Sequence, residues 1–429
     1  MPETLVIRGG RVVDQTGTRD ADVLVESDRI VEVGANLTGD RELDAGGCVV
    51  APGLVDLHVH LREPGMEEAE TIETGARAAA RGGFTALVAM PNTTPPQDDP
   101  AVVASVLAAG ARSCCDVRVA GAITRGRAGT DLAPMGELHA LGVRIFTDDG
   151  ACVDSAGVMR AALDYAASLP GAVIAQHAED TTLAGAGHMH EGDWSSRLGI
   201  PGRPGAAEDT IVARDCILAA LTGSRVHFLH LSTAGAIELV RAAKARGLPV
   251  TAEAAPHHFT LTDAACASFD PVFKVNPPLR TDADVAAVKA GLADGTIDAI
   301  ATDHAPHPTE AKERPFEEAP PGMLGLETAL ALALGELVAP GVMSLRDALA
   351  RLSWAPAAIA GLADHGGPVA PGSAANLCVF DPTQRWVVDA DQLASRARNT
   401  PYAGRELCGR IRHTILRGCA VVVDGEARA

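Results

Sequence analysis

The sequence predicts an α/β fold: a (β/α)8 TIM barrel with a small β-sandwich domain built from both chain ends. Two observations predict it. Between residues 54 and 307, eight short strand-like runs are separated by helix-like segments, and eight βα units are typical of a closed barrel. The two ends of the chain carry strand-like runs in close succession, which is typical of a separate β-domain.

The elements follow in order along the chain. Residues 1–52 are expected to form the N-terminal part of the β-domain, and residues 366–429 its C-terminal part. Residues 53–365 are expected to form the barrel domain. Its strands are expected at LVDLHVH, FTALVAMPN, VRVAGAIT, VRIFTDD, AVIAQHAED, RVHFLHLS, LPVTAEAAPHH and IDAIATDHAPH. Helices are expected over 67–81, 155–168, 206–221, 233–246 and 282–292, with Gly or Pro before the next strand.

The composition excludes several classes of function. A formal charge of −19 argues against a nucleic-acid or anionic-membrane partner, because either would need clustered Lys and Arg. No apolar run approaches the roughly 20 residues of a membrane span, and the N-terminus lacks signal-peptide features, so a cytoplasmic protein is expected. Nine cysteines without a CxxC pattern predict reduced thiols rather than a disulfide framework or a thiolate zinc site.

One predicted strand carries two histidines that can bind a metal ion. His58 and His60 are two positions apart, so they project from the same side of a strand. Further ligand-type residues end later strands, namely Asp148 or Asp149, His177, His230 and Asp303. Because the carboxyl ends of parallel strands meet at one mouth of a barrel, these side chains are expected to converge. Imidazole and carboxylate ligands without thiolates suit a catalytic zinc or similar divalent ion.

Each of these residues also has an ordinary interpretation. A single buried His is usually structural, and a single buried Asp is usually an ion-pair partner. Strand alternation sends only one of Asp148 and Asp149 inward, and it turns His304 away from Asp303, so His304 is expected to be structural. The whole set favours a metal centre, because several buried ligand-type residues without an ion would lack partners.

The stretch 308–321, PTEAKERPFEEAPP, is too charged and Pro-rich for a barrel element. A solvated loop is one interpretation. The other is a lid over the active site, because loops of this length inside compact domains are often functional.

Several motifs together resemble the bacterial dihydroorotases of the class I type, in the amidohydrolase superfamily. The resemblance covers essentially the whole chain and includes DLHVHLREPG (56–65), GGFTALVAMPNTTP (82–95), FTDDG (146–150), QHAED (176–180), HFLHLSTAGA (227–236), EAAPHHFTLTD (253–263), KVNPPLR (274–280) and ATDHAPHPTEAK (301–312). It implies one or two zinc ions per chain, with two favoured, and it selects Asp149 over Asp148. The implied metal ligands are His58, His60, Asp149, His177, His230 and Asp303.

The resemblance also implies a reaction, the reversible cyclisation of N-carbamoyl-L-aspartate to L-dihydroorotate in de novo pyrimidine (UMP) biosynthesis. In the hydrolytic direction a metal-bound hydroxide would attack the ring amide, and Asp303 would be the catalytic proton shuttle. The implied substrate-binding residues are Arg62, Asn92, Asn276, His307, Pro321 and Gly322. Arg62 agrees with the charge argument, since an acidic chain needs a local forked cation to bind a carboxylate.

The lysines and metal ligands distinguish this sequence from related families and from non-catalytic relatives. Hydantoinases, dihydropyrimidinases and allantoinases bridge two metals with a carboxylated lysine near the end of the fourth strand. The four lysines here, at positions 244, 274, 289 and 312, all follow the sixth strand, so Asp149 is expected to take that place. Non-catalytic scaffold partners of aspartate transcarbamoylase characteristically lose metal ligands, which this chain keeps. A small-molecule substrate is expected, while a homodimer and a complex with aspartate transcarbamoylase are left open.

Overall fold

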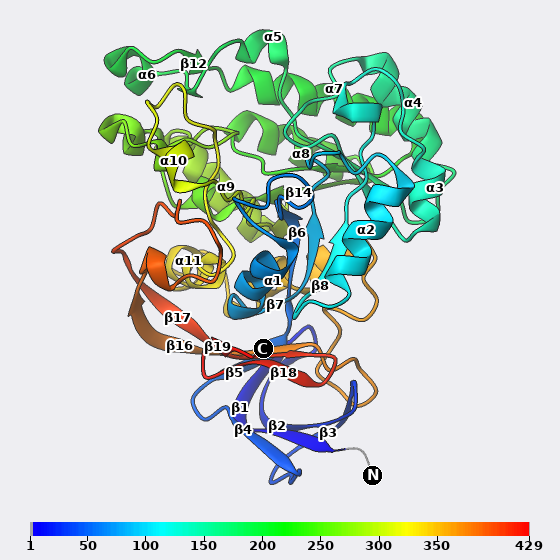
Figure 1. The fold of residues 1–429 in the computed structure, drawn as a ribbon, viewed down its shortest axis with the longest axis vertical. Helices are drawn as coiled ribbons and strands as arrows, with labels where there is room; N and C mark the ends of the chain where they lie inside the picture. The colour runs from blue at the N-terminus through cyan, green and yellow to red at the C-terminus, as the bar shows by residue number, and fades with distance from the viewer. Residues whose placement is uncertain (1–2, 429) are drawn as a thin grey trace.

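The computed structural model describes residues 3–428 and consists of a barrel above a smaller sheet, where both chain ends lie (Figure 1). Eight parallel strands alternate with helices. The strands are β6 (Leu54–Val59), β7 (Phe84–Ala89), β8 (Asp116–Val119), β9 (Ile145–Phe146), β10 (Val173–Gln176), β13 (Val226–Phe228), β14 (Val250–Ala254) and β15 (Ala299–Ile300). The helices that follow them are α1 (Ile72–Arg81), α2 (Pro100–Gly110), α3 (Met135–Ala140), α4 (Ala156–Ala166), α7 (Ala206–Thr222), α8 (Ala234–Ala245), α9 (Asp282–Asp294) and α11 (Ala329–Ala333).

Two parallel sheets close into one barrel. Strands β6, β7 and β8 form the first sheet, and β9, β10, β13, β14 and β15 form the second. A parallel bridge between Gly121 and Phe146 joins them on one side, and a parallel bridge between Val59 and His304 joins them on the other. The predicted (β/α)8 barrel is therefore confirmed.

The N-terminal end of the barrel is closed by apolar packing. Leu57, Val88 and Ile145 project into the barrel interior and pack with Ile359. Ile359 belongs to α13 (Trp354–Ala360), which follows α12 (Leu345–Leu352). The opposite, carboxyl-terminal mouth is thereby left as the open end, where loops position functional side chains in barrels of this kind.

Helix α1 begins five residues later than the sequence predicts. Its N-cap is Thr71, whose hydroxyl accepts the backbone N–H of Thr74 at 3.2 Å in a capping box. Glu70, just before the cap, is fully buried and accepts the N–H of Arg396 at 3.1 Å, so the chain turns inward there. A helix that started at residue 67 would carry Glu70 on its own surface, away from that partner.

Strands from both chain ends form one nine-stranded sheet. Its strands are β1 (Thr4–Asp14), β2 (Gly17–Glu26), β3 (Arg29–Gly34), β4 (Arg41–Asp44), β5 (Val49–Pro52), β16 (Leu377–Val387), β17 (Glu406–Leu416), β18 (Cys419–Val423) and β19 (Glu426–Ala427). The two halves join where β5 pairs antiparallel with β16. Ile7, Ile30 and Val379, from β1, β3 and β16, share one apolar cluster, so the sheet folds over itself as a β-sandwich. The domain boundaries near residues 52 and 365 stay a prediction.

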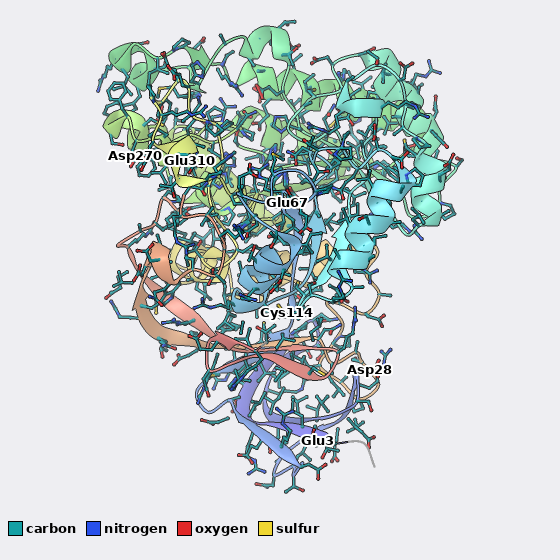
Figure 2. The ribbon with its side chains drawn as sticks, viewed as in Figure 1. Glu3, Asp28, Glu67, Cys114, Asp270 and Glu310 are labelled. Carbon is teal, nitrogen blue, oxygen red and sulfur yellow. The ribbon has the colours of Figure 1, made fainter. Side chains whose placement is uncertain are left out.

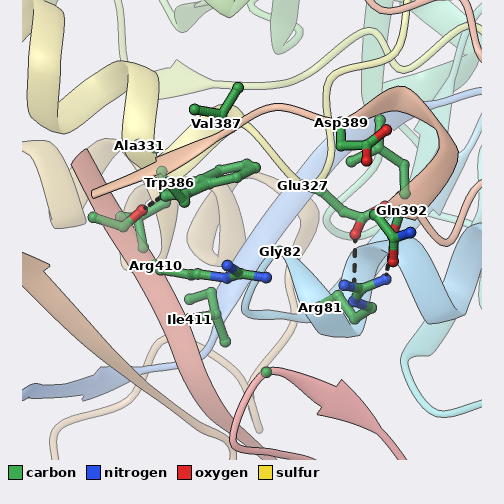
Figure 3. Close-up of a pocket in the computed structure, with 14 residues that line it drawn as sticks. Arg81, Gly82, Glu327, Ala331, Trp386, Val387, Asp389, Gln392, Arg410 and Ile411 are labelled. Atoms are coloured by element: carbon green, nitrogen blue, oxygen red, sulfur yellow. Dashed lines mark hydrogen bonds and ion pairs between the residues drawn. The ribbon is translucent and has the colours of Figure 1, made fainter. Parts of the chain in front are cut away.

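A small cavity of about 160 Å³ lies where the barrel meets this sheet (Figure 3). Arg81, at the end of α1, pairs with Glu327 at 3.5 Å on one side of it. On the other side the Arg410 guanidinium lies 5.4 Å from the ring centroid of Trp386, whose indole N–H donates to the Gly409 carbonyl at 3.0 Å. The Arg81 guanidinium also donates to the Gln392 carbonyl at 2.7 Å, and this polar contact joins the two parts of the molecule.

Across residues 3–428, none of the helices combines the length and the apolar character needed to cross a membrane.

Candidate metal centre and substrate pocket

The six predicted metal ligands converge at the carboxyl-terminal mouth of the barrel. His58 lies in β6, His60 follows β6, and the other four follow β9, β10, β13 and β15 in turn. Each is at most 6 % exposed. They fall into two groups that share one carboxylate, the first formed by His58, His60 and Asp149 and the second by Asp149, His177 and His230.

Asp303 lies beside the first group. His58 Nε2 lies 3.3 Å from Asp149 Oδ1 and 3.5 Å from Asp303 Oδ1. His60 Nε2 lies 3.1 Å from Asp303 Oδ1 and 3.5 Å from Asp149 Oδ2. Two imidazole nitrogens and two carboxylates therefore face one point.

The second group faces Asp149 Oδ1, the same oxygen that His58 of the first group faces. His177 Nδ1 and His230 Nε2 each lie 3.5 Å from Asp149 Oδ1, and they lie 2.9 Å from one another. Asp149 thus stands between the two groups, at the end of the fourth barrel strand.

These donors fit zinc. Zinc bound tetrahedrally at about 2.1 Å from each ligand separates neighbouring ligand atoms by about 3.4 Å, close to most of the spacings here. His58 Nε2 is buried and makes no hydrogen bond to any part of the described chain. A buried imidazole nitrogen aimed at carboxylates without a hydrogen bond is what an ion at this point would satisfy.

Buried partners orient the first pair of histidines. His58 Nδ1 lies 2.9 Å from Glu253 Oε1 in β14, and Glu253 Oε2 lies 2.9 Å from His227 Nε2. Burial acts to raise the pKa of the Glu253 carboxyl, but the hydrogen bonds from His227 and His58 outweigh it and lower that pKa to about 2. His60 Nδ1 lies 2.8 Å from Asn92 Oδ1. Since both oxygens accept, each histidine presents Nε2 to the centre.

A second set of partners surrounds His177. Its Nε2 lies 3.2 Å from Glu179 Oε2, and Glu179 Oε1 pairs with the Arg203 guanidinium at 2.7 Å. Burial acts to raise the pKa of Glu179, yet His177 and Arg203 lower it to about 2. Asn276 Nδ2 donates to Glu179 Oε2 at 2.8 Å, which brings the segment after β14 to the same side of the centre.

The residues expected to face away do so. Asp148 Oδ1 accepts the backbone N–H groups of Ile123 at 2.9 Å and Thr124 at 3.0 Å, so it fixes the loop after β8 while Asp149 points inward. His304 Nδ1 accepts the N–H of Gly325 at 3.2 Å, and its Nε2 faces Glu70 at 3.4 Å. His304 therefore has a structural environment, as alternation along the strand predicts.

A cavity of about 170 Å³ opens beside the centre, and all six residues predicted to bind substrate line it. Arg62 is 8 % exposed, and its Nε donates to the Pro306 carbonyl at 3.1 Å. Burial lowers its pKa to about 10, so the guanidinium stays charged at neutral pH. His307 Nε2 donates to the Pro321 carbonyl at 2.8 Å. Burial and the Arg62 charge lower the pKa of His307 to about 3, which leaves the ring neutral.

Comparison with known proteins agrees with these motifs. A family model described as Dihydro-orotase-like matches residues 47–236. A curated dihydroorotase of Pelotomaculum thermopropionicum is 50 % identical over 424 residues, covering 98 % of this chain and 99 % of the relative. A dihydroorotase of Streptomyces coelicolor is 50 % identical over 431 residues, covering 99 % and 100 %.

This chain belongs to the dihydroorotase family. Solved structures of other cyclic amidohydrolases share its fold. The L-hydantoinase of Arthrobacter aurescens superposes with a TM-score of 0.90 at 27 % identity, covering 100 % of this chain and 98 % of that one. A D-hydantoinase from Thermus sp. gives 0.85 at 27 % identity, covering 99 % and 96 %. These likenesses confirm the predicted barrel with a β-sandwich and support a cyclic amidohydrolase.

In this dihydroorotase-family chain, every lysine is engaged away from the metal centre. Lys244 pairs with Asp298 at 2.6 Å, and Lys289 pairs with Glu336 at 2.8 Å. Lys274 donates to the Phe316 carbonyl at 2.9 Å. Asp149 occupies the end of the fourth strand, so the lysine-bridged arrangement considered from the sequence has no counterpart here.

The fourth lysine organises the segment 308–321. Lys312 ends the short helix α10 (Thr309–Lys312), and its ammonium donates to the carbonyl of Pro320 at 2.8 Å and that of Pro271 at 3.0 Å. Figure 2 labels Glu310 and Asp270 on the same side of the barrel. Pro320 and Pro321 line the cavity, so the segment forms its wall. Movement of this wall as a lid stays a prediction.

Sequence reasoning missed the supporting residues. Glu253 and Glu179 contact histidines of the centre, Arg203 donates to Glu179, and Arg127 donates to the Asp149 carbonyl at 2.7 Å. Glu253 alone carried a usable signal, because a carboxylate inside the apolar run LPVTAEAA needs a buried partner. The other three lie outside the eight barrel strands, in segments whose pairing depends on the complete barrel.

Proposed function

We propose that this chain is a zinc-dependent dihydroorotase, which converts N-carbamoyl-L-aspartate reversibly to L-dihydroorotate in pyrimidine biosynthesis. The observation that carries the proposal is Arg62, a buried charged fork in the same cavity as the histidine and aspartate centre. Dihydroorotate has a carboxylate for this fork to bind, whereas hydantoin has none. The curated relatives that match nearly the whole chain support the same substrate.

His58, His60 and Asp303 would hold one zinc ion with Asp149, and His177 and His230 would hold a second with the same Asp149. Zinc bound there would polarise the ring carbonyl and lower the pKa of the attacking water. Asp149 keeps its charge for this role: burial acts to raise its pKa, but the neighbouring histidines hold the pKa well below the usual range.

Asp303 is the proposed proton shuttle. Burial acts to raise the pKa of its carboxyl, but the hydrogen bond from His60 and the surrounding histidine charges hold the pKa well below the usual range, so the group is ionised at neutral pH. An ionised carboxylate at this point accepts a proton from the attacking water and returns it to the departing ring nitrogen. In the cyclisation direction the same proton moves the other way.

The remaining pocket residues bind and orient the substrate. Arg62, Asn92 and His307 are proposed to bind its carboxylate, while Asn276 and the backbone at Pro321 and Gly322 are proposed to hold the ring. A cavity of about 170 Å³ suits a small molecule of this size. Holding the ring at a fixed distance from the nucleophile removes much of the entropic cost of reaction.

An assay with dihydroorotate, hydantoin and allantoin side by side tests the proposal. We expect hydrolysis of dihydroorotate, and formation of dihydroorotate from N-carbamoyl-L-aspartate in the reverse direction. Faster hydrolysis of hydantoin or allantoin would reject the substrate assignment. Metal analysis of the same sample addresses a scaffold role: a protein without bound metal and without turnover would favour that alternative.

The location and assembly form part of the same proposal. We place the enzyme in the cytoplasm, which nine free cysteines support because disulfides are rare there. A homodimer and a complex with aspartate transcarbamoylase stay predictions, which light scattering of the protein alone and with that enzyme can address.

A further inference from the structure

One buried side chain from the C-terminal part of the chain joins two walls of the substrate pocket. Asn399 lies between β16 and β17 and is 5 % exposed. Its Nδ2 donates to the Ala305 carbonyl at 3.0 Å and to the Gly322 carbonyl at 3.1 Å. Its Oδ1 accepts the backbone N–H of His307 at 3.1 Å. Ala305, His307 and Gly322 all line the pocket.

The chemistry of these contacts requires an amide. Carbonyl oxygens only accept and a backbone N–H only donates, so the orientation of the Asn399 amide is determined by its three partners. Both of its N–H groups are used. A carboxylate would place acceptors against two carbonyls, and an apolar side chain would leave buried backbone groups without partners.

The two pocket walls are the backbone at Ala305–His307 and the backbone at Gly322. They pack too closely for one to move without the other. A Cβ on Gly322 would lie 2.8 Å from the Ala305 Cβ and 2.9 Å from His307 Nε2. The Ala305 N–H also donates to the Met323 carbonyl at 2.9 Å, and Asn399 accepts the Leu324 N–H on its own carbonyl at 3.1 Å. Displacing Asn399 therefore displaces both walls.

The chain just before Asn399 also supports His304, the residue that follows Asp303. Ser395 and the N–H of Arg396 hydrogen-bond to Glu70, which faces His304. The segment 395–399 thus contacts both sides of the loop after β15. Within residues 3–428, it makes no hydrogen bond to any of the six metal-centre residues.

We propose that Asn399 is a positioning residue that holds the Ala305–His307 backbone and Gly322 in the geometry needed to bind substrate. The inference rests on the proposed function for the identity of the substrate. It predicts an effect on substrate binding with metal content preserved, because the amide holds the pocket wall and leaves the metal ligands to their own partners.

The test compares Asn399→Ala with Asn376→Ala. Asn376 is a matched control: it is 4 % exposed, donates to the Asp364 carbonyl at 2.8 Å and accepts the Arg417 N–H at 2.7 Å, near the opposite end of the barrel. For Asn399→Ala we expect kcat/KM for dihydroorotate to fall by about 10²-fold, mainly through KM, as for a misplaced binding group. The metal content should match the parent's. Asn376→Ala should keep the parent's KM even where its Tm falls.

Hydrogen exchange gives a readout that needs no turnover. The His307 amide should exchange faster in Asn399→Ala than in the parent or in Asn376→Ala, since its acceptor is gone. Unchanged exchange, or a KM equal to the parent's, would overturn the inference. A parent enzyme inactive on dihydroorotate would instead overturn the proposed function, because exchange at His307 still reports the Asn399 contact.

Discussion

At the scale of single residues, Asp303 is where metal binding and proton transfer can be separated. Asp303→Asn preserves the shape of the side chain but cannot accept a proton from water. We expect turnover to fall by roughly 10²–10⁴-fold, the range typical of losing a general base. Metal analysis alongside turnover checks this. Metal retained with activity near the parent's would contradict the shuttle. Asp298→Asn, at a carboxylate paired with Lys244, is the control.

Arg62 is the residue that should distinguish substrates with a carboxylate. In Arg62→Lys the charge remains but the planar fork is lost, so we expect binding of dihydroorotate to weaken by about 1.5–3 kcal/mol. Steady-state kinetics measure this as a raised KM. Arg225→Lys is a suitable control, because Arg225 donates to the Gly171 and Ile359 carbonyls at the closed end of the barrel. Equal kinetics for Arg62→Lys and the parent would reject the role.

Glu253 should affect metal affinity without touching the metal. An amide in Glu253→Gln can accept from only one of His58 and His227 with its single oxygen, so the orientation of His58 loosens. We expect metal affinity to drop by about 10–100-fold, as for other partners of metal ligands. Competition with a chelator of known affinity measures it. Glu327→Gln, at a carboxyl that pairs with Arg81 where the barrel meets the sheet, should leave metal affinity unchanged.

Residues differ in how far the sequence could predict them. Five of the six metal-centre residues could be predicted because each lies at or near the end of an apolar run, and the barrel brings run ends together; the choice of Asp149 over Asp148 came from the motif resemblance. The motif resemblance pointed to Arg62 and His307. Glu253 and Asn399 act through partners 195 and 92 positions away, and those pairings exist only in the folded barrel.

At the scale of elements, Glu327, which joins α1 to the segment before α11 through Arg81, should titrate near neutral pH. Burial raises the pKa of Glu327 from 4.5 to about 7, while Arg81 opposes this rise. The folded state therefore binds more protons than the unfolded state between pH 4.5 and 7, and stability from this group is lost as the pH rises through 7.

Thermal unfolding across this range tests the junction. Between pH 4.5 and 7, the Tm of the parent should decline relative to that of Glu327→Gln, which cannot ionise. Glu318 is an exposed carboxylate in the segment 308–321 and supplies the control variant Glu318→Gln. The Tm of this control should follow the parent's. Parallel curves for the parent and Glu327→Gln would contradict the assignment.

Elements were predictable where local pattern and tertiary partner agree. Strand β14 and helix α9 lie where the hydrophobic periodicity of the sequence and the flanking turn residues predict them. Helix α1 does not, because residues 67–71 favour a helix locally while Glu70 has a buried partner in the C-terminal segment. Its true start at Ile72 was set by that distant contact and by the Thr71 cap.

At the scale of the whole molecule, metal should stabilise the fold as well as catalyse. The ligands come from β6, β9, β10, β13 and β15, so an ion links strands on both sides of the barrel. Zinc at about 100 times its dissociation constant would add about 2.7 kcal/mol to the free energy of unfolding. Thermal unfolding of chelator-treated protein with and without added zinc measures it. Asp149→Ala, which removes the shared ligand, should lose most of this response.

The sheet shared by both chain ends has a consequence for the order in which the enzyme is made. A ribosome delivers the N-terminus first, so all six metal-centre residues emerge before β16, β17 and Asn399 do. A nascent barrel can therefore assemble its ligands while β5 still lacks its antiparallel partner β16. The pocket wall is completed only when the returning strands arrive, so the capacity to hold substrate is among the last features the growing chain acquires.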